Sequence, residues 1–258
     1  MRSTRAAEAV AELGSFGARI RTNRQHTMKT TPLKTMTKIM LIVGLYVATA
    51  VQAADRKTIP GFGQLVDPVG DCSVKTENDK TTLTVPGPNR NLSGYFPENN
   101  KAPRILQDVQ GDFTVTVKVA GDFNPQKRRG DNAFNGAGLL IWDSERNFIR
   151  VERNIWVTPE AKRLSYTPLI EHWKDGKNMT PRPGTEKPFW KGKTTYLRVK
   201  RTGDEFTIGV SHDGSQWLDK DMVTAKCPEK IKVGVAAINN SDEPFTVEFS
   251  EFKLTGIR

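Results

Sequence analysis

Two glutamates of this chain, Glu152 and Glu171, lie in stretches where polar and apolar residues alternate. A pair of carboxyl groups is what a glycosidase uses to cleave a glycosidic bond, provided that one is ionised and the other protonated. Arg150 and Arg198 are expected near this pair, and positive charges hold neighbouring carboxyl groups in the ionised form. We therefore favour a non-catalytic role for the two glutamates, with a glycan-cleaving enzyme as the alternative.

The same stretches carry aromatic side chains, which suit a binding role. Trp142 and Phe148 flank a short polar segment, and Trp173 stands two residues after Glu171. Sugar rings stack on aromatic faces, while Arg and Glu side chains bind hydroxyl groups. A face of this kind predicts a carbohydrate-binding surface, and an outer sheet surface with structural Arg–Glu ladders is the competing interpretation. The candidate ligand-binding residues are Trp142, Phe148, Arg150, Glu152, Glu171, Trp173 and Arg198; none is predicted to be catalytic.

A β-hairpin over residues 138–152 must position most of these side chains. Residues 138–142 form a nearly continuous apolar run, residues 143–147 are turn formers, and residues 148–152 alternate with the period of a half-buried strand. A five-residue loop keeps charges off the core face, whereas a four-residue loop mixes the two, so we predict five. The predicted pairs are Trp142–Phe148, Leu140–Arg150 and Gly138–Glu152 on the outer face, and Ile141–Ile149 and Leu139–Val151 on the core face.

Further strands follow the same pattern along the chain. The strictest alternation runs over residues 113–119, with Phe113, Val115, Val117 and Val119 predicted to face the core. The proline- and glycine-rich stretch 174–193 cannot hold a central strand. We find no convincing helix, and ten or more short strands predict an all-β fold, a two-sheet antiparallel jelly-roll sandwich. The other predicted strands cover residues 81–85, 164–173, 196–200, 205–210, 231–238 and 245–254.

The first 53 residues read as an upstream extension followed by a secretory signal peptide. Lys29, Lys34 and Lys38 precede an uncharged apolar run over 39–51, and small residues follow it. The run is short for a membrane span of about 20 residues, although an uncleaved anchor is the alternative. We expect a secreted or periplasmic protein with no stable membrane span after cleavage. Residues 54–258 are predicted to form a single sandwich domain.

The charge and the cysteine content bear on three possibilities: nucleic-acid binding, a disulfide bond and a zinc site. The formal net charge of +10 divides into +6 for residues 1–53 and +4 for the rest, so no nucleic-acid footprint follows. Cys72 and Cys227 either form a disulfide, worth about 4–5 kcal/mol in the chain-entropy model, or remain two free thiols. Two cysteines without a CxxC pair and only three histidines do not predict a zinc site.

Seven short motifs in order make the chain similar to a known family. They are Gly70–Cys72, Ala102–Arg104, Gly111–Phe113, residues 136–153, Tyr196–Arg198, Ser211–Trp217 and Lys232–Ile238. Over roughly residues 60–257 the chain resembles the DUF1349 domains of the concanavalin A-like lectin/glucanase superfamily. The resemblance implies a two-sheet jelly roll with a curved face. It implies function only loosely, because relatives include lectins, carbohydrate-binding modules and glucanases.

The resemblance also bears on catalysis and metals. Glucanases of this superfamily carry a Glu-x-Asp-x-x-Glu pattern on one strand, and this sequence has none. Sandwiches of this type often bind calcium, to which Asp67, Asp71 and Asp112 would contribute, though their spacing does not require it. We expect no other cofactor. The prediction is an exported, non-catalytic, carbohydrate-binding sandwich; a glycosidase of the same fold and a structural or protein-binding sandwich are the alternatives.

Overall fold

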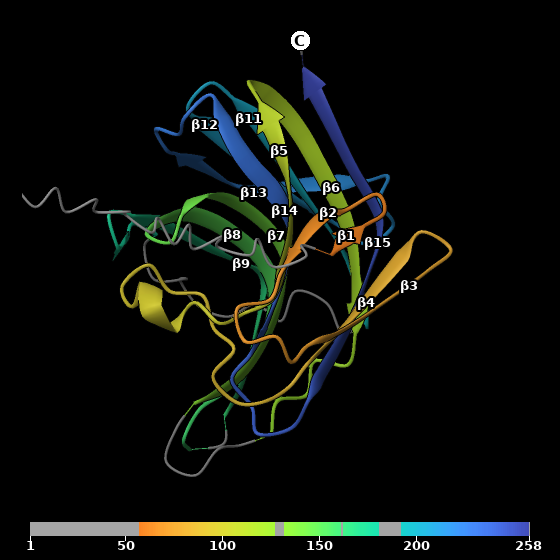
Figure 1. Ribbon diagram of the computed structural model, residues 1–258. Coiled ribbons are helices and arrows are strands. Elements are labelled where there is room, and N and C mark those ends of the chain that lie inside the picture. Colours follow the sequence, from red (N-terminus) through yellow and green to blue (C-terminus); the bar gives the residue numbers. More distant parts are fainter. Residues whose placement is uncertain (1–56, 127–131, 161, 181–191, 258) are drawn as a thin grey trace, which may run out of the picture. The chain divides into compact units, whose positions relative to one another are not determined.

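The computed structural model describes residues 57–126, 132–160, 162–180 and 192–257. Within these ranges the chain forms two antiparallel β-sheets that pack as a sandwich (Figure 1). The one helical element there is η1, a single 3-10 turn at Pro97–Asn99. No helix in the described ranges is long and apolar enough to span a membrane. The predicted signal peptide lies outside the described residues.

One sheet of the described chain has eight strands and the other has seven. The order in the first is β1 (Thr58–Ile59), β2 (Gly63–Val66), β5 (Arg104–Gln110), β14 (Lys230–Asn239), β7 (Ala133–Ser144), β8 (Asn147–Val157), β9 (Arg163–Lys174) and β10 (Lys177–Asn178). The order in the second is β13 (Trp217–Thr224), β12 (Glu205–Ser211), β11 (Thr194–Thr202), β6 (Asp112–Gly121), β15 (Phe245–Ile257), β4 (Lys80–Val85) and β3 (Ser73–Glu77). Strands distant in sequence are neighbours in both sheets, which confirms the predicted jelly-roll sandwich.

The hydrophobic core lies between the two sheets. Phe113, Val115 and Val117 of β6 are fully buried in it, as their alternation predicts. From the eight-stranded sheet, Leu139 and Ile149 enter the same core cluster, each about 1% exposed. The predicted division of the hairpin into a core face and an outer face is therefore confirmed.

The hairpin of β7 and β8 has the predicted register with a shorter turn. Trp142 lies opposite Phe148 and Gly138 opposite Glu152, as expected. The strands continue to the pair Ser144–Asn147, and the ladder shifts register between Trp142 and Ser144. The expected five-residue loop is therefore wrong: a β-bulge absorbs one residue of β7, so a tight turn gives the same pairing.

Edge strands and the short β1–β3 strands were not predicted from the sequence. The eight residues of β13 are almost all exposed, so no alternation of polarity marks this edge strand. In the turn before it, residues 211–217, the carboxylate of Asp213 accepts the N–H groups of Ser215 and Gln216, and Gly214 has φ +77°. These bonds lower the pKa of Asp213. The turn is structural.

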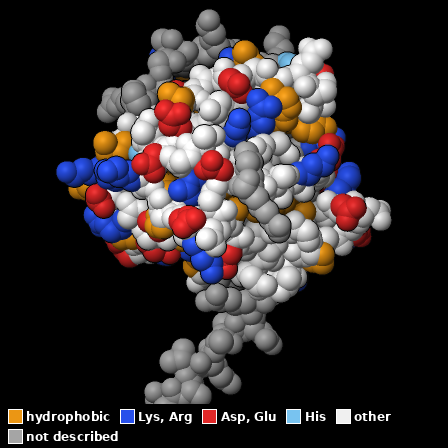
Figure 2. Space-filling model, turned by 90° about the horizontal axis from the view of Figure 1, so that it is seen from above, with side chains coloured by type: hydrophobic (Ala, Val, Ile, Leu, Met, Phe, Trp, Pro, Cys, Tyr) orange, Lys and Arg blue, Asp and Glu red, His pale blue; other side chains and the backbone are white. Residues whose placement is uncertain are grey.

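The protein surface carries charges of both signs. On the face shown in Figure 2, Lys and Arg side chains are interspersed with Asp and Glu, and hydrophobic side chains appear in small groups. That face shows no stripe of one charge.

Candidate functional site

Strand alternation places six of the seven predicted site residues on the outer face of the eight-stranded sheet. Trp142 comes from β7, Phe148, Arg150 and Glu152 from β8, and Glu171 and Trp173 from β9. Direct cross-strand pairing joins Arg150 to Glu171 and Phe148 to Trp173. The predicted clustering of these six side chains is therefore present in the structure.

Arg198 does not join this cluster, which corrects the sequence-based prediction. It lies on β11 in the other sheet, where it forms an ion pair with Asp219 at 2.8 Å. Its guanidinium also lies over the Trp217 ring, 4.4 Å from the ring centroid, which is a cation–π contact. Alternation showed that Arg198 points away from the core, but it carried no information on which sheet the strand enters.

The outer face is covered where the aromatic platform was expected to be open. The segment between β4 and β5, residues 86–103, is called the cover segment below; it lies over this face in yellow in Figure 1. Its Leu92 and Ala102 form a second apolar cluster with Trp142 and Phe148, which are only 8% and 3% exposed. The two rings stack on each other at 5.2 Å under the segment. The prediction that Trp142 and Phe148 are exposed to a ligand is therefore wrong.

Hydrogen bonds fix the cover segment to the sheet. Arg150 Nη1 donates to the carbonyl of Leu92 at 3.0 Å, and Asn100 Nδ2 donates to Glu145 at the tip of the β7–β8 hairpin at 2.7 Å. Arg104 forms an ion pair with the same Glu145 at 3.0 Å. Gly94 lies against Trp173, where an added Cβ would be 2.8 Å from the ring. The segment is therefore an integral layer of the structure.

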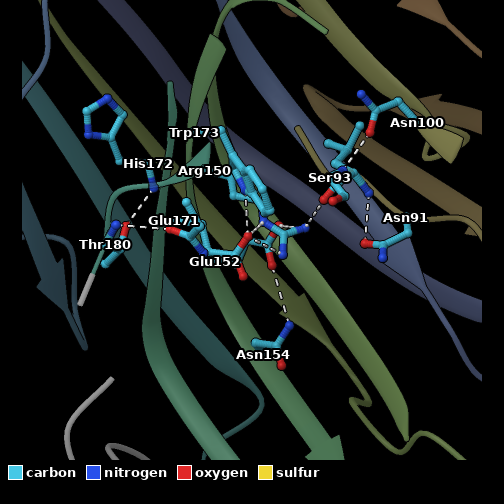
Figure 3. A network of polar contacts seen from close by, with 12 residues as sticks. Asn91, Ser93, Asn100, Arg150, Glu152, Asn154, Glu171, His172, Trp173 and Thr180 are labelled. Atoms are coloured by element: carbon cyan, nitrogen blue, oxygen red, sulfur yellow. Dashed lines mark hydrogen bonds and ion pairs between the residues drawn. The ribbon is translucent and has the colours of Figure 1, made fainter. Parts of the chain in front are cut away.

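Arg150 is the centre of a buried ionic network beneath this segment (Figure 3). Its guanidinium contacts Glu171 at 2.8 Å and Glu152 at 3.7 Å. Glu171 also accepts a hydrogen bond from Trp173 Nε1 at 2.8 Å. The pKa of Arg150 is raised because, although burial opposes its charge, Glu152 and Glu171 stabilise it. The charges on this face bind one another and are not arranged around an open groove.

The pKa of Glu152 is not lowered as its arginine neighbour led us to expect. Burial raises its pKa to about 7, and the opposing effect of Arg150 is smaller. Its Oε1 is buried without a hydrogen-bond partner, and Asn154 reaches Oε2 only at 3.4 Å. The prediction that both glutamates are firmly ionised is wrong for Glu152, because few donors stabilise its charged form.

The polar row continues along β8 beyond Glu152. Asn154 Oδ1 and Trp156 Nε1 are also buried without partners among the described residues. Opposite them, Gly136 makes room for the row: an added Cβ there would be 2.5 Å from Glu152 Oε2. The ladder between β8 and β9 shifts register here, because Pro168 has no N–H to donate. This row is therefore sterically tight opposite Gly136.

A cavity of about 390 Å³ opens instead on the cover segment. We call it the asparagine cavity; its lining residues are Asn89, Asn91, Ser93, Phe96, Asn99 and Lys101 from the segment and Asn240 from the β14–β15 loop. Asn89 has φ +66°, a conformation that asparagine tolerates better than most residues, and it turns the chain after Pro88. Phe96 is 50% exposed, and Tyr95 packs edge-on against it at 4.4 Å.

The asparagine cavity was missed because its segment has no periodic pattern. The available signal was local composition: four asparagines, one serine and two adjacent aromatic residues lie within positions 89–101. Such residues favour irregular backbone, since asparagine side chains bond to nearby main-chain groups. Asn91 Oδ1 accepts the N–H of Leu92, and Asn100 Oδ1 accepts that of Ser93.

The two cysteines are free thiols in the structure, so the disulfide alternative is not realised. Burial, with nearby Asp67, raises the pKa of Cys72 to about 12. Burial also raises the pKa of Cys227. Both groups therefore remain protonated at neutral pH.

The three candidate calcium ligands have other partners. Asp67 accepts the N–H of Cys72 at 2.9 Å, Asp71 forms an ion pair with Arg90, and Asp112 accepts the N–H of Gly203 at 2.7 Å. In the ranges that the structure describes, no group of three or more His, Cys, Asp or Glu side chains is placed to hold a metal ion. The aspartates as arranged here do not fit a shared calcium site.

Comparison with solved structures supports the fold. A functionally unknown protein from Saccharomyces cerevisiae is similar with a TM-score of 0.57 and 18% identity, covering 76% of this chain and 97% of that one. Lectin I-B4 from Griffonia simplicifolia reaches a TM-score of 0.46 at 13% identity, covering 72% and 92%. The xylan β-1,4-xylosidase from Bacillus halodurans C-125 reaches 0.46 at 13%, covering 73% and 38%. Only the first of these TM-scores exceeds 0.5, and at 18% identity that likeness concerns the fold alone.

Comparison with sequences identifies the family. No curated protein sequence matches the chain. A family model, described as "Protein of unknown function (DUF1349)", matches residues 89–257. The match takes in most of the cover segment, both walls of the asparagine cavity and the whole β7–β8 hairpin. Because it extends over more than half of the sequence, the chain belongs to the DUF1349 family.

Proposed function

We propose that this protein is an exported, non-catalytic carbohydrate-binding sandwich, and that its glycan site is the asparagine cavity. The observation that carries the proposal is the chemistry of the lining: several amides and a hydroxyl beside one exposed aromatic ring. Export rests on the signal-peptide pattern of the sequence. The site proposed from the sequence moves from the sheet face to the segment that covers this face.

The cavity has the size and the polar groups that a glycan needs. Its volume of about 390 Å³ falls within the usual range of ligand pockets, roughly 300–1,000 Å³. An asparagine amide carries a donor and an acceptor, a pair that matches neighbouring hydroxyl groups. In this lining Asn91 Oδ1 already accepts the N–H of Leu92 and Asn240 Nδ2 already donates to the carbonyl of Asn132. Phe96 provides an apolar face on which the C–H groups of a sugar ring can stack.

The lining is held in place before a ligand arrives. The bonds from Asn91 and Asn100 fix the backbone at Leu92 and Ser93, and the Glu145 contacts tie Asn100 to the hairpin. A preformed site loses less conformational entropy on binding than a flexible one. This favours the cavity over a loop that orders only around its ligand.

The glycosidase alternative finds less support in the geometry. Glu152 and Glu171 share one guanidinium, Arg150, and the carbonyl of Leu92 binds the same group. Glu152 is 1% exposed. A pKa of about 7 would suit a general acid, but a substrate would have to displace the cover segment to reach it.

Glycan-array screening of the purified protein, followed by titration calorimetry with the best ligand, tests the proposal. Phe96→Ala should weaken binding about tenfold, the value of one aromatic contact of about 1.4 kcal/mol. Asn99→Ala should weaken it as well, because the variant removes a paired donor and acceptor. The control is Leu218→Ala, which truncates an exposed apolar side chain on β13 in the other sheet and should leave affinity unchanged.

Two results would overturn the proposal. One is a flat response to every glycan on the array by a protein that is folded by circular dichroism. The other is glycan binding that is insensitive to Phe96→Ala and Asn99→Ala but lost in Trp173→Ala with the fold retained, which would return the site to the sheet face. Capture of a protein partner without any sugar response would favour the structural or protein-binding alternative.

A further inference from the structure

The asparagine cavity contains one charged side chain, Lys101. The other lining residues are neutral, and no Asp or Glu is among them. The acidic residues next to lining positions in sequence, Glu98 and Asp242, do not themselves line the cavity. The wall therefore carries one positive charge among neutral dipoles.

The ammonium of Lys101 forms no ion pair with the described residues, and what distinguishes it from other unpaired surface lysines is its position on the cavity wall. Lys75, Lys80, Lys118 and Lys232 each contact a carboxylate at 2.7–3.2 Å. The cover segment's arginine, close by in sequence, is neutralised: Arg90 pairs with Asp71. Lys101 is thus an unneutralised cation on the wall of a ligand-sized cavity.

Resting on the proposed glycan function of this cavity, we infer that its ligand is an anionic saccharide, one that bears a carboxylate or a sulfate ester. The anionic group is bound by Lys101 Nζ, while hydroxyl groups of the same sugar meet the asparagine amides. A charge-assisted hydrogen bond of this kind is stronger than one between neutral groups. A neutral sugar in the same position gains no such bond.

The expected size of the preference for a charged sugar follows from the solvent exposure of Lys101. Lys101 is exposed, so water and salt screen its charge. Ion pairs in such positions are worth up to about 1 kcal/mol, which corresponds to about a fivefold difference in affinity between charged and neutral forms of one sugar. Selectivity should therefore be modest at physiological ionic strength and should fall as salt is added.

Matched oligosaccharides test the inference by calorimetry on the full chain. The probes are an oligogalacturonate, its fully methyl-esterified form, which has the same backbone without the charge, and a sulfated galactan oligosaccharide. We expect the oligogalacturonate, the sulfated probe or both to bind about fivefold more tightly than the ester. The two charged probes distinguish carboxylate from sulfate recognition. Lys101→Gln should remove the preference, and Lys101→Arg should retain it.

Lys200→Gln provides the control, because it removes the same charge from an exposed position on β11 in the other sheet. It should leave the preference unchanged. If charged and esterified probes bind equally well, and Lys101→Gln changes neither affinity, the inference is refuted while glycan binding stands. If the preference for charged probes survives Lys101→Gln, whether or not Lys200→Gln removes it, the anionic group is bound elsewhere and the inference is refuted. If no glycan binds at all, the proposed function itself fails.

Discussion

Replacement of Glu152 by glutamine should make the protein more stable at alkaline pH and leave it unchanged in acid. The carboxyl group is 1% exposed, and one of its oxygens has no hydrogen-bond partner. Burial raises its pKa from an ordinary value of 4.5 to about 7. Glutamine has nearly the same shape but no charge to bury, so the variant removes only the titration.

The sign of the effect follows from proton binding. Below pH 4.5 the glutamate is protonated in both the folded and the unfolded chain and contributes no pH dependence. Between pH 4.5 and about 7 the unfolded chain loses the proton while the folded protein keeps it, so stability falls as pH rises. At 1.36 kcal/mol per pH unit, this interval amounts to about 3 kcal/mol, fully lost above pH 7.

Urea unfolding followed by tryptophan fluorescence at pH 4.5, 5.5, 6.5 and 8 measures this difference. Groups common to both proteins cancel, so the free energy of unfolding of Glu152→Gln minus that of the wild type should rise from near zero to about 3 kcal/mol. Glu171→Gln is the matched control: it breaks the 2.8 Å contact with buried Arg150 and should destabilise at pH 8. A difference for Glu152→Gln that is constant with pH, or negative at pH 8, would refute the reasoning.

Two other predictions concern the covered face, and a third concerns the thiol of Cys72. Trp142→Ala should lower the free energy of unfolding by about 3–5 kcal/mol in urea titrations, because the ring is buried between Phe148 and Arg104, and ligand affinity should be retained while the variant is folded. Gly94→Ala should cost about 1–3 kcal/mol and speed proteolytic cleavage within residues 86–103, because its methyl group would meet the Trp173 ring at 2.8 Å; unchanged cleavage would argue against close packing there. Cys72, with its pKa raised to about 12, should react with iodoacetamide far more slowly at pH 8 in the folded protein than in urea, as mass spectrometry would show.

The sandwich could be predicted because alternation along a strand is a local property. The polarity of residues 113–119 and 138–152 is enough to separate the core face from the outer face, and the hairpin register follows from keeping charge off the core. The family was also predicted from seven motifs, of which all but Gly70–Cys72 lie within the matched residues 89–257. The bulge at Asp143 escaped prediction because two loop lengths give the same pairing when one of them contains an extra residue in the strand.

The candidate site was harder to predict because it depends on contacts between distant segments. Leu92 and Ala102 are isolated apolar residues in an aperiodic stretch, and nothing local shows that they bury Trp142. Arg198 was assigned to the wrong sheet because alternation gives orientation and not topology. The proton affinity of Glu152 depends on how few donors surround it, which no sequence pattern records.

In the cover segment, the side chains that pack against the sheet differ from those that line the cavity. Leu92 and Ala102 pack against the sheet and contribute to stability, whereas Phe96, Asn99 and Lys101 line the cavity. If the cavity binds the proposed glycan, changes among the latter would alter ligand preference without loosening the attachment of the segment. The sandwich beneath would then stay the same while a handful of cavity positions diversify, and a new specificity could be grafted at those positions.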